Sequence, residues 1–365
     1  MRQLRIATVV GARPQFIKAV PVSRALAIAG YRETLIHTGQ HYDFRMSGIF
    51  VEELGLKEPE WNLDVRSGAH GRQTGEMMVR LERVLIEDKP DWVIVFGDTN
   101  STLAGALCAA KLGFPVAHVE AGLRSFNRVM PEEINRVLTD HCSAALFCPT
   151  RVSVDNLARE GITNGVHLVG DVMYDAALLF ADHAETKSNI LQRLPCRSGE
   201  YILLTIHRPA NADNPQHLKE ILQAMEVLDA PVVFPVHPRT RSRIVEQGGA
   251  FQGPAISNVH AIDPVGYLDM LMLERNARLI VTDSGGVQKE AYFFRVPCVT
   301  IREETEWVET VESGWNRLVK AEAEAVEKAV RSCSIPPEHP AFYGHGDAAT
   351  RLVQLLGAGS PVDDQ

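Results

Sequence analysis

The sequence lacks several features that would assign it to a specialised class of protein. Its 365 residues contain no apolar run of membrane-spanning length. The apolar run at residues 6–10 is too brief for a signal peptide. None of the six cysteines belongs to a Cys-x-x-Cys pair, and no H-E-x-x-H motif is present. We therefore expect a cytoplasmic protein with reduced cysteines and no bound metal.

Length and charge narrow the class further. A chain of 365 residues is too long for one hydrophobic core, so two domains are expected. We place them at residues 1–170 and 171–345. The net charge of −9 argues against a nucleic-acid-binding surface, although local basic clusters could still hold phosphates. A protein with 45% hydrophobic and 23% charged residues is an ordinary globular protein, and we expect no membrane partner.

Strand and helix patterns alternate along the chain, which predicts parallel sheets with helices on both faces. In the first half, short apolar runs predict strands over residues 4–10, 33–37, 92–96, 116–119 and 145–148. The pattern restarts in the second half, with strands over residues 201–205, 231–235, 259–262, 279–281 and 298–301. The polar stretch 183–198 between the two halves is predicted to be a linker or a surface helix.

Polar side chains follow the C-terminal ends of these predicted strands with unusual regularity. In open α/β sheets, ligands bind at that edge. Two such sheets facing each other would bring all of these side chains to one interdomain cleft. The residues concerned are Arg13, Gln40, His41, Asp98, Glu120, His207, His237, Ser284 and Glu306.

Residues 279–290 predict an anion site. The predicted strand over residues 279–281 is followed by Thr282, Asp283 and Ser284, which could each cap a helix, and by Gly285-Gly286, which leave backbone N–H groups open to a ligand. Free amides and the helix dipole both favour an anion at such a helix N-terminus. Glu290, one turn inside the helix, could accept hydrogen bonds from a ribose diol. The alternative interpretation is an ordinary tight turn between a strand and a helix.

The first turn, Gly11-Ala12-Arg13-Pro14, lacks the G-x-G-x-x-G spacing of a dinucleotide fold, which disfavours a nicotinamide cofactor. Arg13 with Lys18 fits a phosphate clamp at a helix N-terminus, although both could be surface charges. His207-Arg208, at the end of another strand, suits a diphosphate leaving group.

Three carboxylates are candidates for proton transfer. Asp98 follows a buried strand, but it could also simply cap the next helix. Glu120 follows a strand with nothing nearby that needs a cap. Glu132 lies in the first turn of a helix, where the helix dipole alone favours an acid. Carboxylates that converge on one site raise one another's pKa, so some could serve as acid and others as base.

Six motifs, in order over residues 4–352, resemble those of the non-hydrolysing UDP-N-acetylglucosamine 2-epimerases. The motifs are Gly11-Ala12-Arg13-Pro14, Gly97-Asp98-Thr99, His118-Val119-Glu120-Ala121-Gly122-Leu123-Arg124, Pro131-Glu132-Glu133, His207-Arg208 and Thr282-Asp283-Ser284-Gly285-Gly286. The resemblance implies a GT-B fold of two Rossmann-like domains. It also implies a C-terminal helix at about 346–356 that crosses back to the first domain, and a homodimer.

The resemblance also implies a reaction that needs neither metal nor nicotinamide. UDP is eliminated from a UDP-2-acetamido sugar and added back with the opposite configuration at C2. The residues expected to carry out this reaction lie in the matching motifs or at the ends of the predicted strands. The catalytic residues are Asp98, Glu120, Glu132 and His207, and the substrate-binding residues are Arg13, Lys18, Gln40, His41, Arg208, His237, Ser284, Gly285, Gly286 and Glu290.

Two departures from the usual family motifs concern the sugar. Gln15 stands where many members have glutamate, and Trp307 where they have arginine. Both variants resemble the branch acting on UDP-2,3-diacetamido-2,3-dideoxyglucuronate in O-antigen synthesis. We expect both to lie in a region that faces the nucleotide-sugar. Two other functions compete with epimerisation: a GT-B glycosyltransferase that uses a UDP-sugar, and a catalytically inactive sugar-nucleotide sensor.

Overall fold

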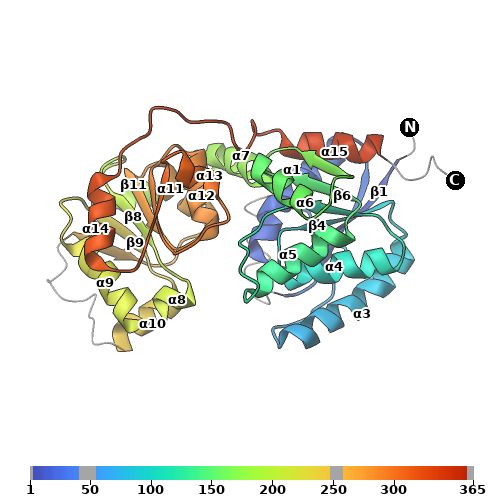
Figure 1. The fold of residues 1–365 in the computed structure, drawn as a ribbon, viewed down its shortest axis with the longest axis horizontal. Coiled ribbons are helices and arrows are strands. Elements are labelled where there is room, and N and C mark those ends of the chain that lie inside the picture. Colours follow the sequence, from blue (N-terminus) through green and yellow to red (C-terminus); the bar gives the residue numbers. More distant parts are fainter. Residues whose placement is uncertain (1–2, 41–54, 247–257, 360–365) are drawn as a thin grey trace. The chain divides into compact units, whose positions relative to one another are not determined.

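The chain forms two compact units, each built on one parallel sheet (Figure 1). The computed structural model describes residues 3–40, 55–246 and 258–359. Unit 1 comprises Met1–Leu179 together with Ala341–Gln365, and unit 2 comprises Phe180–Pro340. The division falls within helix α7, Val172–Lys187, whereas the sequence had placed it at residue 170.

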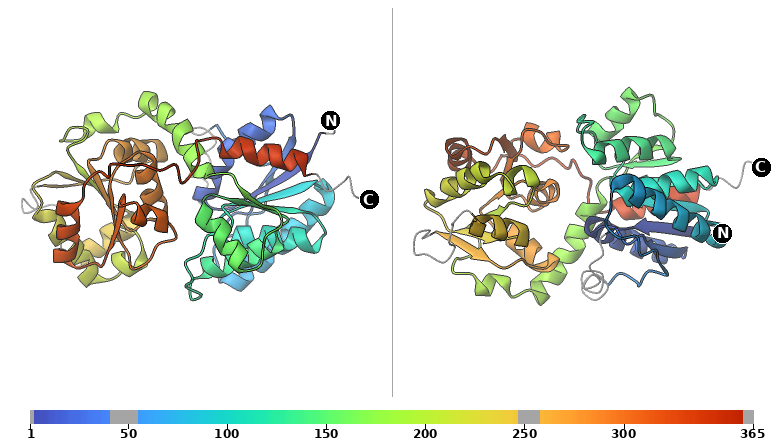
Figure 2. Two further views of the ribbon diagram at one scale, coloured as in Figure 1. Left: turned by 45° about the horizontal axis from the view of Figure 1, so that its top comes forward. Right: turned by 90° about the horizontal axis from the view of Figure 1, so that it is seen from below.

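Unit 1 has a seven-stranded sheet in the order β3-β2-β1-β4-β5-β6-β7, with every neighbouring pair parallel. Its strands are β1 Arg5–Val10, β2 Arg32–His37, β3 Trp61–Asn62, β4 Trp92–Phe96, β5 Val116–Val119, β6 Ala145–Cys148 and β7 Val166–Leu168. Helices cover both faces of this sheet (Figure 2). They are α1 Arg13–Ile28, α3 His70–Asp88, α4 Asn100–Lys111, α5 Pro131–Cys142, α6 Arg151–Arg159 and α15 Ala348–Ala358, with the first part of α7.

Unit 2 has a six-stranded parallel sheet in the order β10-β9-β8-β11-β12-β13. Its strands are β8 Ile202–Thr205, β9 Val232–Pro235, β10 Val259–Ile262, β11 Leu279–Thr282, β12 Cys298–Ile301 and β13 Asn316–Val319. Its helices are α8 Pro209–Ala212, α9 Pro215–Glu226, α10 Pro238–Glu246, α11 Tyr267–Arg275, α12 Gly285–Phe293, α13 Val308–Glu312 and α14 Ala323–Ser332, with a 3₁₀ turn at Ile190–Arg193. The stretch 183–198 therefore contains the end of α7 and this turn.

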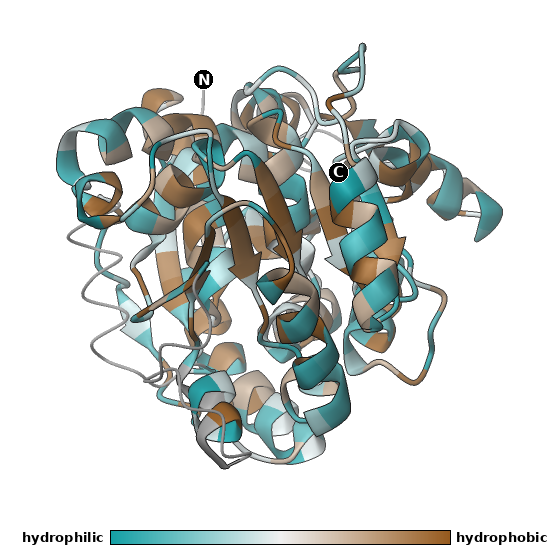
Figure 3. Cartoon of the chain, turned by 90° about the vertical axis from the view of Figure 1, so that its left-hand side faces the viewer, coloured by the Kyte–Doolittle hydropathy of each residue, from teal (hydrophilic) through white to brown (hydrophobic). Residues whose placement is uncertain are grey.

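The predicted strands are confirmed where both faces of a strand are buried. All five residues of β4 and all four of β5, β8, β11 and β12 are buried, which explains their unbroken apolar runs. Figure 3 shows such strands as apolar and the outward faces of the helices as polar. The sequence missed β3, β7 and β13, which are short edge strands with partly exposed residues and so carry no apolar run.

Helix α1 begins at Arg13, directly after the Gly11-Ala12 turn. Pro14 is compatible with a first helical turn because its missing N–H has no partner there in any helix. The Gln15 side-chain oxygen accepts hydrogen bonds from the N–H groups of Gly11 and Ala12, at 2.8 and 3.0 Å. These bonds satisfy backbone donors that a helix start leaves exposed.

The C-terminal helix α15 belongs to unit 1 and lies beside α1 (Figure 1). The Asp175 carboxylate, in the first turn of α7, accepts hydrogen bonds from the N–H groups of Ala348 (3.2 Å) and Ala349 (2.7 Å). Arg351 donates to the carbonyl oxygens of Leu168 and Val169. A buried acid therefore caps α15 at its N-terminus. No helix within the described ranges has the length and apolar character to span a bilayer.

The cap generates a pH-dependent stability. Burial raises the pKa of the Asp175 carboxyl from 3.8 to about 6, although its bonds to Ala349 and Ala348 lower it. Between these two values the folded chain binds more protons than the unfolded chain, so stability falls as pH rises through this window. We expect Asp175 to contribute at most about 3 kcal/mol less stability at neutral pH than in acid.

Asp175→Asn should remove this contribution. In urea unfolding followed by circular dichroism, the stability difference between wild type and Asp175→Asn should shift in favour of the variant between about pH 4 and pH 7. Asp182→Asn, an exposed acid on the same helix, is the matched control and should leave the pH dependence unchanged. An identical pH dependence in wild type and Asp175→Asn would contradict the assignment.

Candidate active site

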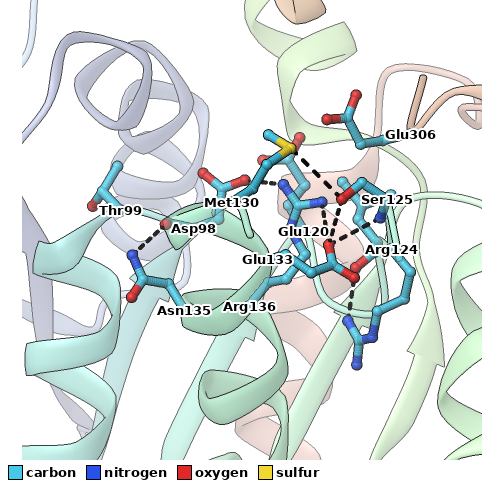
Figure 4. Close-up of polar contacts among 12 residues, drawn as sticks. Asp98, Thr99, Glu120, Arg124, Ser125, Met130, Glu133, Asn135, Arg136 and Glu306 are labelled. Atoms are coloured by element: carbon cyan, nitrogen blue, oxygen red, sulfur yellow. Dashed lines mark hydrogen bonds and ion pairs between the residues drawn. The ribbon is translucent and has the colours of Figure 1, made fainter. Parts of the chain in front are cut away.

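Asp98 lies just past the end of β4 and is not a helix cap. The N-cap of α4 is Thr99, whose hydroxyl accepts from the Thr102 N–H, so the capping alternative for Asp98 is wrong. The Asp98 carboxylate instead forms an ion pair with Arg136, and its backbone carbonyl accepts from the Asn135 amide at 2.9 Å (Figure 4). Helix α5 thus holds both the main chain and the side chain of Asp98.

Glu120 follows β5 in a strained backbone conformation. Its φ is +74°, in the left-handed region, which costs a residue with a Cβ on the order of 1–3 kcal/mol. The side chain is 7% exposed and forms an ion pair with Lys18 of α1. Gly97, with φ of +63°, makes room for this pair, since a Cβ there would lie 3.3 Å from the Glu120 carboxylate. Strain of this kind is concentrated at functional sites.

The sequence reasoning missed the residues that hold this edge together. Arg136 bridges Asp98 and Glu133, with 3.1 Å to the Glu133 Oε2. Glu133 is 2% exposed and also accepts from the Ser125 N–H and hydroxyl and from the Phe126 N–H, at 2.9 to 3.0 Å. Figure 4 shows that Glu133 and Arg136, both on α5, lie beside Asp98. The sequence feature that could have indicated them is the i, i+3 spacing of Glu133 and Arg136, which favours an ion pair on one face of a helix.

Four further residues of unit 1 were predicted to lie at the site. Glu132 is exposed in the first turn of α5, and Arg13 is the first residue of α1. The Gln40 side-chain oxygen accepts from the N–H (3.0 Å) and hydroxyl (2.6 Å) of Ser101, so Gln40 ties the end of β2 to the start of α4. His41 lies outside the described residues.

In unit 2, a buried aspartate orders the end of β8. Asp283 is fully buried and accepts from the N–H groups of His207 (3.1 Å) and Arg208 (3.0 Å) and from the Asn211 amide (3.2 Å). The His207 ring Nδ1 lies 3.2 Å from the same carboxylate, while the ring is half exposed. The sequence reasoning considered Asp283 only as a possible cap. Asp283 instead orients His207, with Nε2 pointing away from it.

The start of α12 has the features of an anion site. Ser284 is the N-cap, and its hydroxyl accepts from the Val287 N–H at 3.4 Å. A Cβ on Gly285 would lie 3.6 Å from the Arg208 guanidinium and 3.9 Å from that of Arg302, so both cations face this turn. Arg302 is also ion-paired with Glu306 at 3.1 Å. Two guanidinium groups beside a helix N-terminus favour a multiply charged anion.

Glu290, one turn into α12, is 5% exposed and accepts from the Tyr267 hydroxyl at 3.0 Å. The fully buried Glu274 lies close enough to interact with it electrostatically. Burial, and then the proximity of Glu290, raises the pKa of Glu274 well above its usual range. His237, the other unit 2 candidate, is exposed between β9 and α10.

The expectation that Gln15 and Trp307 face the nucleotide-sugar is wrong. Both residues are buried: Gln15 is 2% exposed and Trp307 is 4% exposed. The Gln15 amide donates to the Phe96 carbonyl (2.8 Å) and the Thr102 hydroxyl (3.0 Å), inside unit 1. The Trp307 ring lies 4.0 Å below the ammonium of the buried Lys289. Gln15 therefore supports the end of β4, and Trp307 packs against α12.

The described part of the chain contains no group of three or more His, Cys, Asp or Glu side chains arranged to hold a metal ion. The charged side chains at the strand ends are instead engaged in ion pairs and backbone hydrogen bonds. Such an arrangement can move protons and bind an anion.

Comparison with known proteins agrees with the resemblance seen in the motifs. The family model described as UDP-N-acetylglucosamine 2-epimerase matches residues 25–357. The chain is 47% identical to the UDP-2,3-diacetamido-2,3-dideoxy-D-glucuronate 2-epimerase of Pseudomonas aeruginosa, over 97% of this chain and 99% of that protein. It is 46% identical to the UDP-N-acetylglucosamine 2-epimerase of Methanocaldococcus jannaschii, with the same coverage.

Solved structures confirm the GT-B fold class. The crystal structure of the Methanocaldococcus jannaschii enzyme in complex with UDP-GlcNAc and UDP superimposes with a TM-score of 0.88 and covers 98% of this chain and 100% of that one. The calicheamicin glycosyltransferase CalG4, at 16% identity, shares the fold alone, with a TM-score of 0.57 over 99% of this chain and 96% of that one. The family match over most of the chain and the full-length relatives show that this protein belongs to the UDP-N-acetylglucosamine 2-epimerase family of isomerases.

Proposed function

We propose that the protein epimerises a UDP-2-acetamido sugar at C2 by eliminating UDP and adding it back. The main observation behind this proposal is that the two units present different kinds of side chain at their strand ends. Unit 1 presents carboxylates at its strand ends, and unit 2 presents cations around a helix N-terminus. The chain is also 46% identical to an enzyme whose crystal structure contains UDP-GlcNAc and UDP.

The reaction needs elimination because the C2 hydrogen is not adjacent to a carbonyl group. A base removes the C2 proton, the C1–O bond to the diphosphate breaks, and UDP leaves with the electron pair. The product is a 2-acetamidoglucal with a C1–C2 double bond. UDP oxygen then attacks C1, and an acid delivers a proton to the other face of C2. Atoms and charges balance without an oxidant or a cofactor.

Asp98, Glu120 and Glu132 are the proposed proton-transfer groups. Asp98 and Glu120 are held in ion pairs with Arg136 and Lys18, and a carboxylate held in this way can accept a proton. Glu132 is exposed, so its proton can exchange with water. These three acids thus provide both acceptors and a solvent-exchangeable donor.

The proposed UDP site lies at the start of α12. Ser284, Gly285 and Gly286 would hold the diphosphate, and the Glu290 carboxyl oxygens would accept from the ribose hydroxyls. His207 and Arg208 would stabilise the departing phosphate, since Asp283 directs the His207 Nε2 outward. The remaining members of the proposed substrate set are Arg13, Lys18, Gln40, His41 and His237.

Which sugar is preferred remains a proposal. The 47% identity to the diacetamido-glucuronate enzyme supports the uronate, and the 46% identity to the Methanocaldococcus jannaschii enzyme supports UDP-N-acetylglucosamine almost equally. Because Gln15 and Trp307 are buried, neither can bind a C6 carboxylate directly. We keep the diacetamido-uronate as the preferred substrate, with a role in surface polysaccharide synthesis, including the O-antigen of lipopolysaccharide, in the cytoplasm.

We also propose that the protein is a homodimer. Exposed apolar side chains on two helices of unit 1 that both pack against α4 support this proposal. On α3, Val79 and Ile86 are 57% and 53% exposed, and on α5 Ile134 and Leu138 are 48% and 46% exposed. Each pair lies on one face of its helix, because residues four or seven apart share a face.

Proton NMR in deuterated water tests the reaction. We expect C2 epimerisation with deuterium incorporated at C2, because the C2 proton passes to a carboxylate that exchanges with solvent. Side-by-side kinetics on the two UDP-sugars should give the higher kcat/KM with the diacetamido-uronate. Epimerised product without deuterium over many turnovers would rule out elimination. Transfer of sugar to an acceptor with release of UDP would instead identify a glycosyltransferase.

Substitution of the three acids tests their roles. Asp98→Asn, Glu120→Gln and Glu132→Gln should each lower kcat on the order of a hundredfold or more, the usual scale for general acid–base groups. UDP affinity measured by calorimetry should be retained, since the proposed UDP site lies in unit 2. A variant that keeps its turnover but loses UDP affinity would reassign that residue to binding.

Arg136→Lys tests the bridge between Asp98 and Glu133. A lysine cannot hold two carboxylates at once in the planar geometry of a guanidinium. We expect kcat to fall about tenfold or more while UDP affinity is kept. Arg128→Lys, an exposed arginine on the preceding loop, is the matched control and should be silent. Unchanged kcat in Arg136→Lys would show that Asp98 does not need this partner.

A further inference from the structure

His118 is a fully buried histidine in β5 whose two ring nitrogens are both hydrogen-bonded. Nδ1 lies 2.7 Å from the Asp140 carboxylate of α5, and Nε2 lies 2.8 Å from the carbonyl oxygen of Gly97. The Gly97 carbonyl can only accept a hydrogen bond, so Nε2 must carry a proton. The remaining question is whether Asp140 is an acceptor or a donor.

Asp140 is 1% exposed and accepts from three sides. Its second oxygen lies 2.7 Å from the Arg124 guanidinium and 3.2 Å from the Gly122 N–H. Burial alone would raise its pKa, but His118 and Arg124 together hold the pKa of Asp140 below its usual range. Asp140 is therefore a carboxylate, and Nδ1 must donate to it. With both nitrogens acting as donors, the ring is an imidazolium.

The charge of this imidazolium is balanced by a buried chain of ion pairs. Arg124 binds Asp140 on one side and forms two bonds to Glu160 on the other, at 2.7 and 2.8 Å. Glu160 is 28% exposed and ends the chain near the surface, 3.5 Å from His141. His118, Asp140, Arg124 and Glu160 thus alternate in sign. This alternation of sign allows the three charges of His118, Asp140 and Arg124 to be buried together, with Glu160 at the surface end.

His118 lies between the two strand ends that carry the proposed acids. Its Nε2 proton is bonded to the carbonyl that immediately precedes Asp98, and its own main chain is two residues from the strained Glu120. The bond to Gly97 is charge-assisted and therefore stronger than a neutral one. The other titratable groups around this chain are Cys148 of β6, which interacts with Asp140 and Arg124, and the Lys18–Glu120 and Arg136–Asp98 pairs.

We propose that His118 is a positioning residue whose two ring nitrogens both donate, and which fixes the Gly97–Asp98 turn so that Asp98 is aligned for proton transfer. It touches no substrate and acts through the Gly97 carbonyl. If the ring lost its second proton at alkaline pH, a lone pair would face either Gly97 or Asp140, and one of the two bonds would be lost. The positioning role rests on the proposed function, whereas the charge state of the ring does not.

The charge state can be measured without any substrate. In long-range ¹H–¹⁵N correlation spectra of protein labelled at histidine, we expect His118 at pH 7 to show two protonated ring nitrogens. Its signals are identified by their loss in His118→Gln. A single protonated nitrogen at pH 7 would overturn the proposal. This result stands whether or not a UDP-sugar is turned over.

The positioning role is tested by kinetics. His118→Gln should lower kcat at least about tenfold, with the dissociation constant for UDP within about twofold of wild type. Full kcat in a folded His118→Gln would overturn the role. Because this variant removes a buried charge and could fail to fold, Glu160→Gln provides a second test at the surface end of the chain.

Without the Glu160 charge, Asp140 is the only carboxylate of the chain that faces both Arg124 and His118. The positive charge on the His118 ring is then stabilised less. In Glu160→Gln we expect the alkaline limb of kcat to move to lower pH, together with the loss of the second ring proton in the spectra. Asp155→Asn, on the same helix and 52% exposed, removes one charge outside the chain and should move neither. An alkaline limb that stays in place while the ring titration moves would show that the charge of His118 does not position Asp98. A wild-type protein with doubly protonated His118 but no epimerisation of either UDP-sugar would refute the proposed function alone.

Discussion

Parallel strands all end at the same edge of a sheet, and in unit 1 that edge is held by ion pairs. Lys18 pairs with Glu120, Arg136 bridges Asp98 and Glu133, and Arg124 joins Asp140 to Glu160. Each charge on the edge thus has an opposite charge on a neighbouring helix or loop. Without these partners, burial would favour neutral acids, and the edge would lose both its charge and its geometry.

These contacts also explain how the structure tolerates local strain. Glu120 has a left-handed backbone that glycine would adopt more easily. The N–H groups of Glu120 and Ala121 both donate to the Phe147 carbonyl at 3.1 Å, and Lys18 holds the side chain. Glycine would adopt this conformation at lower cost but would lack the carboxylate. The position therefore favours chemistry over local stability, as is common at active sites.

The sequence predicted the strand ends well because buried parallel strands leave continuous apolar runs and because the polar residues follow them. It could not predict which way those polar residues point. Gln15 and Trp307 stand within family motifs, yet both are buried. Gln15 donates to the Phe96 carbonyl at the end of β4, and Trp307 packs against Lys289 of α12. Asp283 and His118 have partners 76 and 22 residues away, and no local pattern records such contacts. Edge strands β7 and β13 carry too few apolar residues to be seen.

Unit 1 is assembled from two separate stretches of chain, and unit 2 from a single one. During synthesis on a ribosome, unit 2 has all of its residues before α15 exists, whereas unit 1 must wait for α15. Until then the Asp175 carboxylate has no α15 amides to accept from, and the face of α1 that packs on α15 is uncovered. The helical layer of unit 1 is therefore completed only after the whole of unit 2 has been synthesised. This order would delay a fully stable unit 1 until unit 2 has been made.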